Sequence, residues 1–286
     1  MKIALATCTE LPGWEVDDKP LINALTQLDA EVQLPAWDAE FDWNQFDITV
    51  IRTTWDYHSR KEEFVTWCQS VPRLCNNANI VDWNTHKSYL RELESNGVAI
   101  APTVWIDTGE QSELARIMQN LNATRGFIKP QVGACASDTL RFSIDEITQA
   151  QQFLDSNKHQ DMMVQPYLES VETEGELSAI FIDGKYTHGV QKIPVEGDYR
   201  VQDDFGASDI SYTFTEAEIQ TMQEVLLHVP DQKELLYARF DYLRDAKGTL
   251  LLNELELVEP SLFFRHCEDS AVALANAIVH RAKISP

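Results

Sequence analysis

Three carboxylates near the C-terminus have the residue type and spacing of a metal site. Asp241 lies on one predicted strand, residues 236–243, and Glu254 and Glu256 lie on the next, residues 249–256, across a hairpin turn signal. Alternate residues of a strand face the same side, so all three carboxylates can share one face. A hard cation relieves their repulsion, and oxygen ligands favour Mg²⁺ or Mn²⁺ over zinc. The alternative is a solvated edge hairpin in an acidic protein.

A lysine and a small-residue loop form a candidate phosphate site. Lys129 lies on the predicted strand 126–132, and the loop that begins at Gln131 and runs to Ser137 has backbone N–H groups that could surround a phosphate. The loop lacks the Walker A pattern, and a tight turn beside a structural lysine is the alternative.

The tract Gln165-Pro166-Tyr167-Leu168 runs from a predicted strand into a connection. Pro166 lacks an N–H, so this connection could offer a carbonyl there and the N–H of Leu168 to a flat donor and acceptor edge such as adenine. The tract by itself indicates only that such a contact is structurally possible.

The residues from Arg52 to His58 follow an apolar strand, at the end where open α/β sheets place ligand sites. Arg52 could pair with a substrate carboxylate and Asp56 with an amine, while Trp55 and Tyr57 form a wall. His58 could act as a base, although a lone histidine near a helix start is more often structural. The alternative for the whole segment is a buried tryptophan in a helix-capping turn.

Strand and helix signals alternate through the first 84 residues, which predicts a parallel sheet. The expected elements are strands 3–8, 31–37, 46–53 and 74–80, a helix after Asp17, and a helix capped at Ser59. Further along, the pattern predicts helices at 84–97, 111–121, 145–156, after Thr215 and at 268–282, with strands at 100–106, 126–132, 162–166, 176–182 and 185–193. These elements must position the candidate residues above.

Composition narrows the class of partner. The 286 residues include 23 basic and 46 acidic side chains, a formal charge of -23, which argues against nucleic acid and anionic membranes as partners. Five cysteines without metal-ligand spacing indicate reduced thiols and a cytoplasmic protein. No signal peptide or membrane span is predicted, and a homodimer is the common expectation for a soluble enzyme.

Taken in order, the motifs resemble those of the ATP-grasp superfamily and of its glutathione synthetase-like branch. The residues that carry the resemblance are Lys87, Lys129, Gln165 to Leu168, Glu176, Lys192, Arg200, Asp241, Glu254 and Glu256. With the segments 52–58 and 197–202, the chain is similar to the small ATP-grasp ligases that include O-ureido-serine cyclo-ligase.

The resemblance implies an α/β, ATP-grasp fold with an N-terminal Rossmann-like pre-ATP-grasp domain and two α+β lobes that clamp ATP. It places the N-terminal domain at residues 1–84, a linker helix and small lobe with the phosphate loop at 85–166, and a large lobe with the metal site at 167–286.

The resemblance also assigns roles to residues. Lys87 and Lys129 would contact the ATP phosphates, and Glu176 would bind the ribose. Tyr167 and Leu168, next to Gln165, would form the adenine hinge. The metal ligands for Mg²⁺ would be Asp241, Glu254 and Glu256. Glutathione synthetase has Asn at the position of Glu256 and Arg at that of Ser178, so an identical substrate is not expected.

The implied activity is an ATP-dependent carboxylate–amine ligase that acts on small amino-acid-like molecules through an acyl phosphate, by amide formation or ring closure. Lys192, Arg200 and Arg239 are placed to neutralise the developing negative charge, or else are surface cations paired with acids. The alternatives are an ATP-grasp phosphotransferase or kinase, which needs no amine, and a nucleotide-binding protein without turnover.

Overall fold

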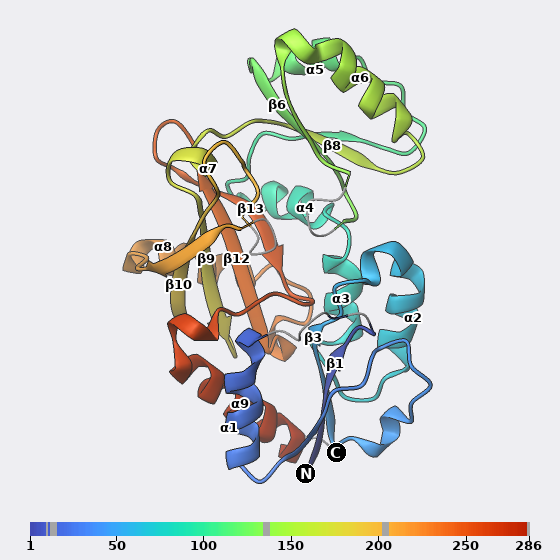
Figure 1. Ribbon diagram of the computed structural model, residues 1–286, viewed down its shortest axis with the longest axis vertical. Coiled ribbons are helices and arrows are strands. Elements are labelled where there is room, and N and C mark those ends of the chain that lie inside the picture. Colours follow the sequence, from blue (N-terminus) through green and yellow to red (C-terminus); the bar gives the residue numbers. More distant parts are fainter. Residues whose placement is uncertain (10, 12–15, 134–137, 202–205, 285–286) are drawn as a thin grey trace.

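The computed structural model describes residues 1–9, 11, 16–133, 138–201 and 206–284. These residues form three β-sheets arranged along the long axis of the molecule, with the N-terminal sheet at one end and a small helix-covered sheet at the other (Figure 1). Among the helices of these described ranges, none is long and apolar enough to cross a membrane.

The N-terminal sheet is parallel, as predicted, with the strand order β2-β1-β3-β4. Its strands are β1 (Lys2–Thr7), β2 (Glu31–Gln33), β3 (Ile48–Thr53) and β4 (Leu74–Cys75). Ile3 and Leu5 pack on one face with α1 (Lys19–Gln27), while Ala4 and Ala6 face α2 (Lys61–Ser70). The alternation of side chains along β1 therefore serves two helical layers.

Two local predictions in this region are wrong in detail. A 3-10 turn over Tyr57–Arg60 precedes α2, so Ser59 does not cap that helix. The strand predicted at 74–80 ends at Cys75, because the Asn77 side chain accepts a hydrogen bond from the Ile80 N–H and begins α3 (Ala78–Asn84). The next helix, α4 (Tyr89–Ser95), begins after Lys87.

The small lobe is an antiparallel sheet of order β5-β8-β6-β7. Its strands are β5 (Val104–Ile106), β6 (Arg125–Pro130), β7 (Leu140–Ser143) and β8 (Met162–Pro166). The helices α5 (Leu114–Asn120) and α6 (Ile147–Ser156) share a core with this sheet. The sequence had not predicted β7.

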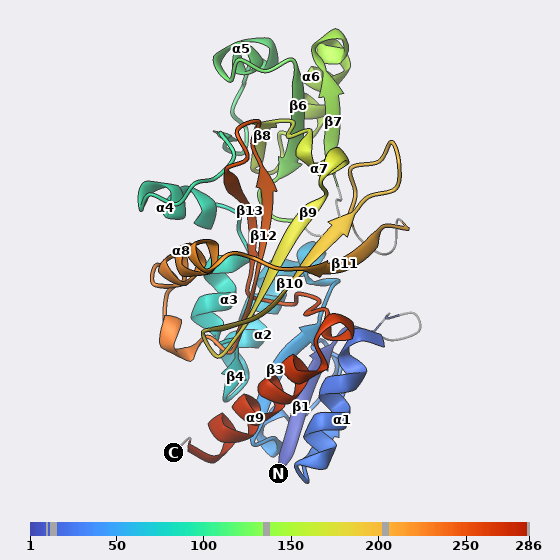
Figure 2. The same cartoon turned by 90° about the vertical axis from the view of Figure 1, so that its left-hand side faces the viewer.

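The large lobe is an antiparallel sheet of order β11-β10-β9-β12-β13 that runs between the two other sheets (Figure 2). Its strands are β9 (Glu176–Ile182), β10 (Lys185–Ile193), β11 (Ser208–Tyr212), β12 (Tyr237–Arg244) and β13 (Leu250–Glu256). The short helix α7 (Ser170–Thr173) precedes β9, and α8 (Glu216–Leu226) shares a core with one face of the sheet. The other face carries the polar residues of the site.

The C-terminal helix α9 (Glu268–Ile284) lies beside α1 and packs in the same core as β1 (Figure 2). Ile180 and Ile182 of β9 belong to that core as well, so α9 joins the N-terminal sheet to the large lobe. The domain limits at residues 84 and 166 remain predictions.

Candidate active site

A cavity of about 360 Å³ lies where the small lobe, the large sheet and the N-terminal segment meet. Most of the side chains expected at a nucleotide and substrate site line it together. They are Trp55, Tyr57, Lys87, Lys129, Gln165, Tyr167, Leu168, Glu176, Lys192, Arg200, Arg239, Asp241, Glu254 and Glu256. Residues from distant parts of the sequence thus converge on one hollow, although their individual roles remain predictions.

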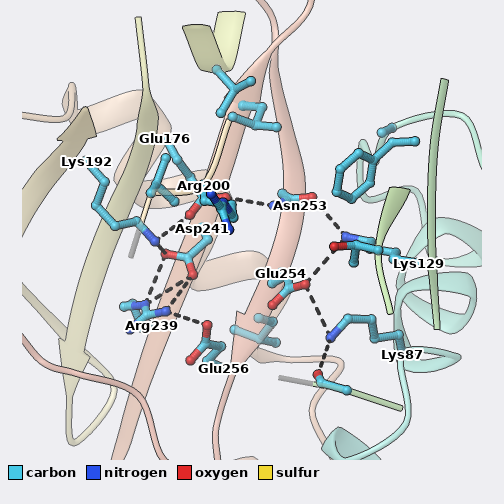
Figure 3. A pocket seen from close by; sticks show the side chains of 18 of the residues that line it. Lys87, Lys129, Glu176, Lys192, Arg200, Arg239, Asp241, Asn253, Glu254 and Glu256 are labelled. Carbon is cyan, nitrogen blue, oxygen red and sulfur yellow. Dashed lines mark hydrogen bonds and ion pairs between the residues drawn. The ribbon is translucent and has the colours of Figure 1, made fainter. Parts of the chain in front are cut away.

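The hairpin brings the three predicted carboxylates side by side on adjacent strands. Asp241 of β12 pairs with Glu254 of β13, and Arg239 pairs with Glu256. Directly opposed residues of antiparallel strands share a face, so these four side chains form one charged surface (Figure 3). Although β13 is the last strand of its sheet, these four side chains line the cavity and form ion pairs there.

Glu254 lies between two lysines from other elements. Its Oε1 is 3.2 Å from Lys87 Nζ and 3.4 Å from Lys129 Nζ (Figure 3). Burial would raise the pKa of Glu254, but the two lysine charges outweigh it and lower that pKa. Lys87 also donates to the carbonyl of Gly133 at 3.2 Å, at the start of the small-residue loop. The loop residues Ala134 to Ser137 lie outside the described residues.

Asp241 is only 2% exposed and lies between Arg239 and Lys192. Arg239 also forms an ion pair with Glu256, and Lys192 forms one with Glu176. Burial opposes ionisation of Asp241, but the Arg239 and Lys192 charges lower its pKa well below the usual range. These residues alternate in charge across four strands, β9, β10, β12 and β13, so their charges neutralise one another.

The donor set of the hairpin suits a hard cation. Burial, together with the charges of Asp241 and Glu254, raises the pKa of Glu256 to about 7 although Arg239 opposes the shift. An oxygen-only set that is held close against its own repulsion fits Mg²⁺ better than a soft metal. Within the described ranges, no cluster of three or more His, Cys, Asp and Glu has the geometry of a formed metal site, since lysine and arginine hold the carboxylates. Metal binding therefore remains a prediction.

The part of the cavity that the sequence predicts to bind adenine has an apolar lining. Phe127, Val171 and Leu243 line it together with Tyr167 and Leu168. The Arg125 guanidinium lies 4.3 Å from the centre of the Tyr167 ring, and the Tyr167 hydroxyl donates to Glu172 at 2.6 Å. These contacts hold the Tyr167 side chain in place, next to the connection after β8 that is predicted to contact adenine.

Two predicted nucleotide contacts have partners in this structure. Glu176 accepts from Asn253 Nδ2 at 2.7 Å on its second oxygen. Burial raises the pKa of Glu176 although Lys192 opposes the shift. Gln165 is buried and donates to Thr103 at 2.9 Å. Arg200, which is predicted to be a catalytic residue, also lines the cavity, and its Nη2 donates a hydrogen bond to Asp198 Oδ2 at 2.7 Å.

Three residues of the N-terminal segment do not lie where the sequence suggested. The described residues that line the cavity include Trp55 and Tyr57 but not Arg52, Asp56 or His58. Asp56 accepts from Trp37 Nε1 and from Arg60, and the His58 ring contacts the Trp55 carbonyl. The predictions that Asp56 pairs with a substrate amine and that His58 acts as a base are therefore corrected. Both side chains contact groups of the protein and lie outside the lining of the cavity.

Arg52 is also a structural residue. It is 1% exposed and makes two hydrogen bonds to Asp18, at 2.8 and 2.9 Å, and one to the carbonyl of Pro260 at 3.1 Å. Nε and Nη2 of its guanidinium are thus committed to groups of the protein, and Nη1 is buried without a hydrogen-bond partner among the described residues. The prediction that Arg52 binds a substrate carboxylate is wrong, because the Asp18 carboxylate, in the 3-10 turn just before α1, already pairs with the guanidinium.

We expect Arg52→Ala to lower the free energy of unfolding by about 3 kcal/mol, because it leaves Asp18 buried without its cation. Denaturant unfolding followed by circular dichroism measures the change. The matched control is Arg91→Ala on the exposed side of α4, which should be close to neutral. Unchanged stability of Arg52→Ala would contradict the structural role.

Sequence reasoning missed Asn253. The strict alternation of a strand places it on the face opposite to Glu254, but a bulge at this point of the β12–β13 pairing brings both side chains to the cavity. Asn253 then contacts Glu176 and also Lys129 at 3.3 Å. Glu259, which follows β13, also lines the cavity and was not predicted. The only feature of the sequence that pointed to Glu259 was its position shortly after Glu254 and Glu256.

The sequence is similar to known proteins along almost its whole length. Residues 3–79 match the family described as the N-terminal domain of D-cycloserine synthetase DcsG. The cycloserine biosynthesis protein DcsG of Streptomyces lavendulae is 30% identical, over 98% of this chain and 99% of that protein. The crystal structure of D-cycloserine synthetase DcsG matches with a TM-score of 0.86 at 26% identity, covering 99% of this chain and 100% of that one.

More distant structures share the fold. A D-alanine–D-alanine ligase from Bacillus anthracis, complexed with ATP, has a TM-score of 0.67 at 13% identity, covering 99% of this chain and 97% of that one. A RimK domain ATP-grasp protein from Sphaerobacter thermophilus has a TM-score of 0.69 at 12% identity, covering 98% and 100%. These likenesses confirm the predicted α/β ATP-grasp fold.

Proposed function

This chain belongs to the ATP-grasp ligase family of the cycloserine biosynthesis protein DcsG, and from that premise we propose that it closes a ring within one amino-acid-like substrate. Family membership makes it an ATP-dependent ligase that forms C–N bonds. The proposal adds the route, which is activation of the substrate carboxylate as an acyl phosphate. The observation that supports this carboxylate activation is the network of alternating lysines, arginines and carboxylates in the cavity (Figure 3).

The proposed nucleotide position follows from the lining of the cavity. Adenine would lie in the apolar part of the cavity beside Tyr167 and Leu168, the ribose near Glu176, and the phosphates between Lys87 and Lys129. Asp241, Glu254 and Glu256 would hold Mg²⁺, which supplies charge neutralisation at the phosphate oxygens when bound. Because Lys87 and Lys129 both contact Glu254 in this structure, nucleotide binding requires them to exchange a carboxylate for phosphates.

The two chemical steps place different demands on the chain. In the first, a substrate carboxylate oxygen attacks the γ-phosphorus, and the bond to the β,γ-bridging oxygen breaks to release ADP. In the second, the substrate nitrogen attacks the acyl carbon, loses a proton and displaces phosphate. Negative charge develops on oxygen in both steps, and the cavity offers Lys192 and Arg239, which contact Asp241, and Arg200 as cations to neutralise it.

Product analysis with one substrate tests the ring closure. The protein is incubated with Mg-ATP and O-ureidoserine, the molecule for which the similar ligases are named, and ADP, phosphate and the organic product are measured. We expect equal amounts of ADP and phosphate and a cyclic product without added amine. A requirement for a second amine would replace ring closure by intermolecular ligation. A stable phosphorylated product without free phosphate would indicate a kinase.

A further inference from the structure

Residues 258–261, which lie just after the end of β13, are held in place by side chains from other elements. Each backbone carbonyl of residues 258–261 accepts a hydrogen bond. In chain order the donors are Tyr237, Trp55, Arg52 and Arg239, at 2.7, 3.0, 3.1 and 3.0 Å. Two of these donors come from the N-terminal domain and two from β12, so the segment is fixed between the two parts of the cavity wall.

This segment presents Glu259 to the cavity, next to Trp55 and Tyr57. The other carboxylates that line the cavity each form an ion pair with a lysine or arginine; they are Glu176, Asp241, Glu254 and Glu256. For Glu259, no ion pair is found among the described residues. The remaining stretches of the sequence contain no Lys, Arg or His, so they cannot supply a cation either.

The surroundings of Glu259 favour a cation that the protein itself does not provide. Burial, with a contribution from the charge of Glu256, raises the pKa of Glu259 to about 8, although the charge of Lys87, a hydrogen bond from its own backbone N–H and the charge of Arg239 oppose the shift. Glu259 is half-buried, and a carboxylate withdrawn from water without a cationic partner is unfavourable; an ion pair with a bound ligand removes that cost. The aromatic side chains of Trp55 and Tyr57 also favour a nearby cation.

We infer that Glu259 is the receptor for the ammonium group of the amino-acid substrate, an inference that rests on the ligase function proposed above. An ammonium at Glu259 and a carboxylate toward Arg239 and Lys192 would orient the substrate at two points. The four bonds at residues 258–261 keep the receptor in position before the substrate arrives, so little ordering accompanies binding. Arg52 and Trp55 are positioning residues in this arrangement.

The inference is tested by binding of O-ureidoserine and of its α-N-acetyl derivative to the protein saturated with ADP and Mg²⁺. Isothermal titration calorimetry is carried out with the wild-type protein, with Glu259→Gln, and with Glu62→Gln on the exposed side of α2 as the matched control. The amide keeps the shape of Glu259 but removes its charge. Affinity for ADP alone provides the internal reference for an intact site.

We expect Glu259→Gln to weaken O-ureidoserine binding by roughly 30-fold, as loss of a buried charge partner does, with ADP affinity unchanged. The acetylated compound should bind the wild type weakly and be insensitive to the substitution. Equal affinity of wild type and Glu259→Gln for the free amine would overturn the inference, as would equal affinity of the wild type for both compounds. The second comparison does not depend on the variant folding.

Turnover with Mg-ATP, measured on the same proteins, separates this inference from the ligase proposal. If O-ureidoserine binds in a Glu259-dependent manner but Mg-ATP yields no ADP, the ligase proposal fails and the ammonium receptor stands. If the wild type and Glu259→Gln form the cyclic product with equal KM for O-ureidoserine, the receptor is excluded and the ligase proposal stands.

Discussion

Asp241→Asn is expected to reduce ATP-dependent ADP formation by about 10³-fold, the scale seen when a single pre-organised electrostatic contact is lost from an active site. Asp241 joins the charged residues of two strands, since it forms ion pairs with Arg239 of β12 and Lys192 of β10. It also accepts a hydrogen bond from Ser178 of β9. The asparagine keeps the shape but removes the charge. It therefore weakens the proposed metal site and leaves two cations with one carboxylate fewer to neutralise them.

The measurement is ADP release as a function of Mg²⁺ concentration. The matched control is Asp245→Asn, which makes the same chemical change in the turn of the same hairpin, where the exposed side chain caps backbone N–H groups of Lys247 and Thr249. Circular dichroism during heating confirms that each variant folds. Turnover by Asp241→Asn that equals the wild type at limiting Mg²⁺ would exclude Asp241 as a metal ligand.

The part of the site on the β12–β13 hairpin could be predicted because it depends on local rules. A turn signal and the two-residue period of a strand are enough to predict that Asp241, Glu254 and Glu256 lie on one face of neighbouring strands. The same rules fail at Asn253, since a bulge shifts the pairing by one residue and no residue type in the sequence marks it. One irregular position thus hid a side chain that contacts both Lys129 and Glu176.

The misplaced residues depend on contacts between distant positions. Arg52 has the chemistry of a carboxylate receptor, and the sequence cannot show that Asp18, 34 residues earlier, already occupies it. Glu259 is the converse case, because it is the cavity carboxylate for which no ion pair is found among the described residues. Local sequence patterns report which groups a residue can bind. Only the fold determines which of those groups are left for a ligand.

Lys129→Met is expected to lower kcat/KM for ATP by about 10²- to 10³-fold while KM for the amino-acid substrate changes little. Lys129 is 5% exposed, and burial together with the charge of Lys87 lowers its pKa although Glu254 opposes the shift. Methionine has a similar volume, so the substitution removes the charge with little loss of packing. Steady-state kinetics with each substrate varied in turn measures the effect. Lys185→Met at the exposed start of β10 is the matched control.

A double variant separates two explanations for such a loss. Lys129 neutralises Glu254 in this structure, so its removal could act through the unpaired carboxylate alone. In that case the double variant Lys129→Met/Glu254→Gln would regain activity, because it also removes the Glu254 charge that Lys129→Met leaves unpaired. If Lys129 instead binds the phosphates and Glu254 the metal, the double variant loses both contacts and is less active than either single variant. We expect the second result, and recovery of activity would contradict the nucleotide role of Lys129.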